Sequence, residues 1–203
     1  MKKLMPLLLI VVFFTCSIFS QVPAKDFNEA EVFWYGLDFS QAKLVGSAGF
    51  TDPEAIRNDF FEKWNSLILV EADKYDLKGA FKKPALKYDA EMIKAINMKV
   101  DHHALVQDKS HAITKEDVEN AVKQYNTDQK EGYGLVFVVE SFDKIQEKAF
   151  VWVTVFDVSN KKILITERME GEPRGFGLRN YWAGAIYEII TDIRKVKYKS
   201  WFR

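Results

Sequence analysis

Cysteine is almost absent from this sequence, because the only one among its 203 residues is Cys16, close to the N-terminus. A chain that loses residues 1–20 has no cysteine left. Disulfides, thiolate metal sites and cysteine nucleophiles are then excluded. A domain of this size buries enough core to fold without disulfides, and 16 Phe and 5 Trp make that core dense.

An excess of charge is also missing, because 29 basic and 29 acidic residues give a formal net charge of zero. Proteins that bind nucleic acid present a concentrated basic face, so no nucleic acid partner is expected. Beyond the N-terminal segment, no apolar run approaches the ~20 residues of a membrane span. No repeat or Pro/Gly-rich linker divides residues 21–203, which we predict to form a single domain.

The N-terminal segment has the three-part layout of a secretion signal. Lys2 and Lys3 supply the positive start, Leu4 to Phe14 form the apolar run, and Ser20 suits the position before cleavage. We therefore predict that residues 1–20 are a signal peptide. The mature chain would begin near Gln21 and be periplasmic or secreted.

Cys16 leaves open an alternative, in which the chain is a bacterial lipoprotein cut just before a lipid-bearing cysteine. Such signals place Leu, a small residue and then Gly or Ala ahead of that cysteine. Here Phe13, Phe14 and Thr15 precede Cys16. We favour the interpretation in which Cys16 lies within the signal peptide and carries no lipid.

The first half of the remaining chain predicts a strand and two clear helices. Val32 to Phe39 has the branched and aromatic residues of a strand. Thr51-Asp52-Pro53 provides a cap and a first-turn proline for a helix that ends near Tyr75. Thr114 and Asp117 form an approximate capping box for a helix to Tyr125. Between these helices the pattern is weak, and suggests only a short strand at Leu86–Tyr88 and a short helix capped by Asp89.

Three strands and a long helix complete the predicted fold. Leu135 to Val139, Phe150 to Phe156 and Ile163 to Met169 are joined by short links, which favour antiparallel hairpins. Helical spacing then continues from Leu178 to Val196. The fold class expected from these elements is a two-layer α+β domain, with amphipathic helices packed on a mainly antiparallel mixed sheet.

The hairpin from Ala149 to Thr166 carries a resemblance to a known class of domain. A strand ending in Phe156-Asp157-Val158 turns and returns as Ile163-Leu164-Ile165-Thr166. It resembles the hairpin in the periplasmic domain of the curli secretion channel and in the N-terminal domain of the Tol-system propeller protein. Asn160 and Lys161 replace the usual Thr-Gly, and Gly36-Leu37-Asp38-Phe39 replaces a first strand that often ends in Pro-Phe.

The chain is also similar to small secreted Bacteroidetes-type proteins of unassigned activity. The similar segments are Tyr35 to Ser40, Gly134 to Ser141 and Arg179 to Ala183. Both resemblances imply an envelope compartment and a small α/β domain. They transfer no functional residue.

A glycine-rich stretch before the long helix is the candidate ligand site. It contains Arg174, Gly175, Gly177 and Arg179. The N-terminus of a helix offers free N–H groups and a positive dipole end to an anion. The spacing matches neither a dinucleotide fingerprint nor a P-loop, so a flexible strand-to-helix turn is the alternative.

Other groups of polar residues suggest weaker hypotheses. His102, His103 and His111 lie in one segment, but adjacent histidines lack ligand spacing, so neither a metal nor another cofactor is expected. Acid–base hydrolysis would need a carboxylate pair among residues at strand ends. These residues are Glu140, Asp143, Asp157, Glu167 and Glu170.

The C-terminal segment Lys195 to Arg203 mixes cations with aromatic residues. A peripheral membrane contact is one interpretation. Favourable charge at a helix C-terminus, or a short final strand suggested by the alternation from Lys195 to Lys199, are structural alternatives.

The function predicted from the sequence is therefore binding rather than catalysis, because no catalytic motif is present. We expect a non-catalytic cell-envelope domain that binds a protein partner or aids envelope assembly. The alternative is a secreted protein that binds a small ligand or an anion through the Arg174–Arg179 turn. A hydrolase that uses strand-end acids is the least favoured hypothesis.

Overall fold

The computed structural model describes residues 24–129 and 131–202. The predicted cleavage after Ser20 and the alternative lipidation of Cys16 lie outside the described residues. The strands are β1 (Val32–Asp38), β2 (Lys43–Val45), β3 (Lys87–Tyr88), β4 (Val106–Gln107), β5 (Tyr133–Asp143), β6 (Lys148–Asp157) and β7 (Ile163–Gly171). The helices before β5 are α1 (Ala24–Glu29), η1 (Ser47–Gly49), α2 (Pro53–Ala55), η2 (Ile56–Phe60), α3 (Phe61–Val70), α4 (Ala72–Tyr75), α5 (Leu77–Ala80), α6 (Glu91–Asn97), η3 (His102–Ala104) and α7 (Lys115–Lys123). Those after β7 are α8 (Gly177–Asp192), η4 (Ile193–Lys197) and α9 (Tyr198–Trp201).

The sheet is built around β5, the longest strand. On one edge β5 pairs with β1 along its first half and with β2 along its second half, both in parallel. β3 and β4 add outside β1 and β2, again in parallel. On the other edge β6 pairs antiparallel with β5, and β7 with β6.

The prediction of a mainly antiparallel sheet is wrong, because four of the six strand pairings are parallel. The predicted hairpins β5–β6 and β6–β7 are confirmed. The error concerns β1, because a long segment that contains several helices separates β1 from β5 in the sequence. A crossover of that length allows a parallel neighbour, and strand patterns alone do not show which edge β1 joins. The α+β class itself is correct.

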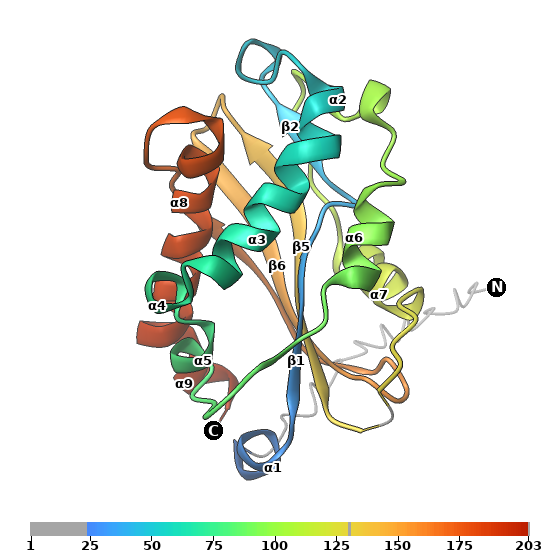
Figure 1. Cartoon of the computed structure of the whole chain (residues 1–203), viewed down its shortest axis with the longest axis vertical. Coiled ribbons are helices and arrows are strands. Elements are labelled where there is room, and N and C mark those ends of the chain that lie inside the picture. Colours follow the sequence, from blue (N-terminus) through green and yellow to red (C-terminus); the bar gives the residue numbers. More distant parts are fainter. Residues whose placement is uncertain (1–23, 130, 203) are drawn as a thin grey trace, which may run out of the picture.

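Helices cover both faces of the sheet, so the predicted two-layer arrangement is also wrong (Figure 1). Side chains alternate along each strand between the faces. Trp34 and Phe137 belong to the larger core, which contains residues of α3 and α8. Tyr35 and Val138 belong to the smaller core, which contains residues of α6 and α7.

Two helix starts follow the predicted capping chemistry and one does not. The Asp52 side chain accepts a hydrogen bond from the Ala55 N–H at 2.9 Å, and Thr114 forms the expected capping box. The residue before α6 is Ala90, which has no capping side chain, so the prediction for Asp89 is wrong. Asp89 instead accepts a hydrogen bond from Gln129.

Both ends of the described chain meet at one end of the molecule, where α1 lies near α9 (Figure 1). The rings of Phe27 and Phe202 stack with centroids 4.2 Å apart. The buried ammonium of Lys83 donates to the carbonyls of Phe27, Asn28 and Ala30, at the end of α1. The C-terminal segment is helical rather than a strand, and its aromatic residues belong to the core.

Candidate functional site

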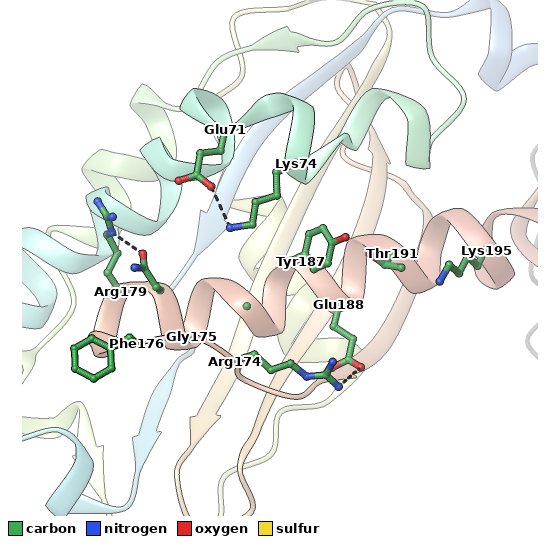
Figure 2. Close-up of a pocket in the computed structure, with 12 residues that line it drawn as sticks. Glu71, Lys74, Arg174, Gly175, Phe176, Arg179, Tyr187, Glu188, Thr191 and Lys195 are labelled. Carbon is green, nitrogen blue, oxygen red and sulfur yellow. Dashed lines mark hydrogen bonds and ion pairs between the residues drawn. The ribbon is translucent and has the colours of Figure 1, made fainter.

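A groove of about 700 Å³ runs along the outer side of α8. Figure 2 shows α8 crossing the view, with Lys74 on one side of the helix and Arg174 on the other. Residues of the α3–α4 junction, the loop before α8 and α8 itself line the groove. The loop and both helices therefore determine how its charged groups are placed.

The loop between β7 and α8 is held against the helix by its backbone. The Arg174 N–H donates to the Tyr181 carbonyl at 3.0 Å. The loop passes so close to α8 that a Cβ at Gly184 would lie 2.2 Å from the Arg174 carbonyl oxygen. Only glycine permits that approach without a shift, so Gly184 fixes the position of Arg174.

The first turn of α8 is tied to α3 in a similar way. The indole N–H of Trp64, which is buried in the core, donates to the Arg179 carbonyl at 2.9 Å. The side chain of Arg179 projects from this fixed turn toward the groove (Figure 2). The backbones that carry both arginines are thus anchored.

Phe176 is the most exposed aromatic side chain of the described residues, at 94% exposure. Its backbone is extended, while Gly175 and Gly177 on either side have φ angles of +124° and +77°. Residues with a Cβ rarely adopt these values. The two glycines therefore let the chain turn sharply around a phenylalanine that faces solvent.

Cations predominate over acids among the groove residues. Lys74 pairs with Glu71 at 3.1 Å, and Arg174 lies 3.2 Å from Glu172 and 3.5 Å from Glu188. The guanidinium of Arg179 donates to the Asn180 side chain. Among the described residues, neither Arg179 nor Lys195 has a carboxylate within 4.0 Å, so these two charges remain available to a ligand.

An unused hydrogen-bonding group lies beside Lys74. The buried hydroxyl of Tyr75 has no hydrogen-bond partner among the described residues. Burial raises the pKa of Tyr75, while the positive charges of Lys74 and Arg179 lower it and so oppose the burial. The Tyr75 ring also packs edge to face against Tyr187 of the groove, with centroids 6.2 Å apart. Tyr75 is therefore a neutral, buried residue next to Tyr187, and it is not one of the residues that line the groove.

The structure brings most of the predicted ligand-site residues together. Arg174, Gly175 and Arg179 line the groove, whereas Gly177 is the first residue of α8 and does not. Sequence reasoning did not single out Lys74, and it named Lys195 only as part of the cationic C-terminal segment. The helical spacing of a sequence does not show which distant surface a lysine on that helix will lie beside.

Each of the five strand-end acids forms an ion pair or accepts hydrogen bonds from neighbouring groups in the fold. Glu140 pairs with Arg168, Glu167 with Lys197 and Glu170 with Lys148. Asp143 and Asp157 accept N–H groups of their own hairpin turns. These contacts give the acids structural roles.

The three histidines also have structural contacts. The rings of His102 and His103 pack with centroids 4.0 Å apart, and His111 hydrogen-bonds the Gln41 carbonyl at 2.9 Å. In the part of the chain that the structure describes, no three His, Cys, Asp or Glu side chains gather as a metal site would require.

Comparisons with known proteins add no relative. No protein-family model matches the chain, and no match is found among curated proteins or solved structures. The resemblance of the hairpin to envelope domains therefore stays a prediction. Over residues 24–129 and 131–202, no helix has the length and apolar character needed to span a membrane.

Proposed function

We propose that this protein is a non-catalytic domain of the cell envelope that binds an anionic partner in the groove along α8. The observation that supports this most is the placement of Arg174, Arg179, Lys74 and Lys195 around one groove, beside the exposed Phe176. This combination provides both attraction for negative charge and an apolar contact. The two functions expected from the sequence, protein binding and anion binding, can share this surface.

The fold leaves several positive charges around the groove without a buried carboxylate partner. Arg179 and Lys195 face the groove, and the ion pairs of Lys74 and Arg174 are largely exposed. Exposed pairs contribute about 0–1 kcal/mol, so an anionic ligand can replace their carboxylates at little cost. The exposed ring of Phe176 adds apolar surface that a partner would remove from water.

Crosslinking from the groove tests this proposal directly. A photoreactive phenylalanine analogue replaces Phe176 in one sample and Met98, a partly exposed residue after α6, in a matched control. Both full-length proteins are irradiated in the cells that produce them. We expect an adduct from position 176 that disappears in the Arg174→Ala/Arg179→Ala variant. Absence of any adduct at 176, or the same adduct from position 98, would contradict the proposal.

The envelope location has its own test. The signal layout of residues 1–20 supports export of the mature chain into the periplasm or medium. N-terminal sequencing of protein recovered from those fractions should begin near Gln21. Recovery of the intact chain from the cytosol with Met1 retained would contradict export, and a lipid-modified Cys16 in the membrane fraction would favour the lipoprotein alternative.

A further inference from the structure

We infer that the groove ligand is an extended, acidic segment of a partner protein, about eight residues long, with one apolar side chain that packs on Phe176. This inference rests on the proposed function and specifies its ligand. It follows from the length of the groove, from the spacing of its charges and from the exposed aromatic ring.

The length of the groove suits a peptide rather than a small anion. Phe176 and Lys195 both line it, and at ~1.5 Å per helical residue they lie about 28 Å apart along the axis. An extended chain that rises ~3.3 Å per residue covers this distance with about eight residues. A single phosphate or carboxylate would reach only one of the two ends.

The distribution of charge favours carboxylates that are spaced along a chain. Arg179 lies near one end of the groove, Lys74 near the middle and Lys195 at the other end (Figure 2). Glu71 and Glu188 lie between these cations. A dense polyanion such as a sulfated glycan would meet both carboxylates, whereas a peptide with spaced acids can avoid them.

The aromatic end of the groove favours a protein segment for a second reason. Phe176 is 94% exposed, and Tyr187 along α8 is 38% exposed. A purely ionic ligand would leave both rings in water. An apolar side chain that covers Phe176 gains roughly 25 cal/mol for each Å² of apolar surface removed from water.

Peptide binding by the mature protein tests the inference. The probe is a fluorescein-labelled octapeptide with four Glu, three Ser and one Phe at one end, followed by fluorescence anisotropy. Arg179→Glu and Lys195→Glu should each weaken binding at least tenfold. Lys123→Glu, an exposed lysine at the end of α7, is the matched control and should change binding less than twofold.

Two altered peptides separate the contributions of charge and of the apolar side chain. Replacement of the four Glu by Gln should abolish binding. Replacement of the peptide Phe by Ser should weaken binding to the wild-type protein, but have little further effect on the Phe176→Ser variant. Equal effects in both proteins would overturn the predicted contact with Phe176.

The remaining outcomes distinguish this inference from the proposed function. If the octapeptide fails to bind while the adduct from position 176 persists, the peptide inference is overturned and the groove remains a binding site. If a heparin octasaccharide binds more tightly than the peptide and shows the same sensitivity to Arg179→Glu, the ligand is a polyanion and the inference is overturned. Loss of both the adduct and peptide binding overturns both.

Discussion

The side-chain amides of Asn65 and Asn97 donate hydrogen bonds to the same backbone oxygen, that of Leu37, at 3.2 and 2.9 Å. The oxygen of Asn65 accepts from the Leu37 N–H, and that of Asn97 accepts from the Phe39 N–H, both at 2.7 Å. Among the described strands, β3 pairs with β1 only at Phe33 and Trp34, and so it ends before this part of the β1 edge. Two asparagines from α3 and α6 thus take the place of a neighbouring strand.

This arrangement predicts cooperative loss of stability. Asn65→Leu or Asn97→Leu leaves a buried backbone N–H without its acceptor, which costs about 1–3 kcal/mol. Either single variant still satisfies the Leu37 oxygen through the other asparagine. The double variant removes both donors, so its loss should exceed the sum of the single losses in urea unfolding.

The control for the asparagine pair is Asn120→Leu, on the exposed side of α7. An exposed substitution of this kind should change stability by less than about 0.5 kcal/mol. Simple additivity of the two buried asparagines would show that they do not share the Leu37 carbonyl.

The ion pair between the buried Glu140 and the partly exposed Arg168 gives a second prediction. Glu140 is fully buried and accepts three hydrogen bonds from the Arg168 guanidinium, at 2.7 to 3.2 Å, and one from Trp152 at 3.0 Å. Arg168→Met leaves a buried carboxylate unpaired and should cost about 3 kcal/mol. In a Glu140→Gln background the same change should cost much less, because no charge remains. Equal costs in chemical denaturation would contradict the pairing.

An exposed ion pair provides the comparison. Lys63 and Asp59 lie 3.4 Å apart, and both side chains are about half exposed. Lys63→Met should change stability by less than about 1 kcal/mol. A loss as large as that of Arg168→Met would show that burial of Glu140 is not the cause.

Local chemistry made much of the fold predictable. The helix start at Asp52, the capping box at Thr114 and the hairpins around β6 depend on neighbouring residues, and all three are present. The parallel placement of β1 depends on contacts far apart in sequence, which no local pattern contains. Val196 fits the helical spacing and yet is 57% exposed. Helical spacing shows which residues share a face, but it does not show how far the sheet extends beneath that face.

The candidate site was predictable only in part for the same reason. Arg174 and Arg179 lie in a short stretch whose glycines indicate a turn before a helix. Lys74 lies at the same groove only because α4 packs against α8. That packing is a tertiary contact, which the sequence pattern around Lys74 does not contain. No sequence pattern indicated that Phe176 would be exposed, because aromatic residues beside a helix are usually buried in the core.

The C-terminal segment gives a third prediction. Phe202 stacks on Phe27, so Phe202→Ala removes a buried ring and should destabilise the protein by about 3–5 kcal/mol. Lys199→Ala, an exposed neighbour, should have little effect on thermal unfolding. Unchanged stability in Phe202→Ala, together with lost binding to anionic phospholipid vesicles, would instead support the membrane contact suggested by the sequence.

Asp38 gives a prediction about pH. Its carboxyl is fully buried at the end of β1, where it accepts hydrogen bonds from the Ser40 N–H at 2.7 Å and from the Tyr125 hydroxyl. Burial raises the pKa of Asp38, although these hydrogen bonds lower it in part. Burial also raises the pKa of Tyr125 well above its ordinary value, so the tyrosine stays neutral at physiological pH. Asp38 is therefore the group of this pair whose charge changes.

A carboxyl with a raised folded-state pKa stabilises the fold fully below its unfolded pKa of about 3.9, and this contribution is lost as pH rises through the folded value. Asp38→Asn keeps an acceptor for Ser40 and a polar partner for Tyr125 but does not titrate. Urea unfolding from pH 4 to 8 should therefore show wild type losing stability relative to Asp38→Asn as pH rises. Asp117→Asn is the control, because hydrogen bonds from Thr114 lower the pKa of Asp117. Its contribution is lost only as pH falls below the unfolded pKa of about 3.9, so wild type and Asp117→Asn should differ by a nearly constant amount from pH 4 to 8. A constant difference between wild type and Asp38→Asn over this range would show that Asp38 does not change its charge there.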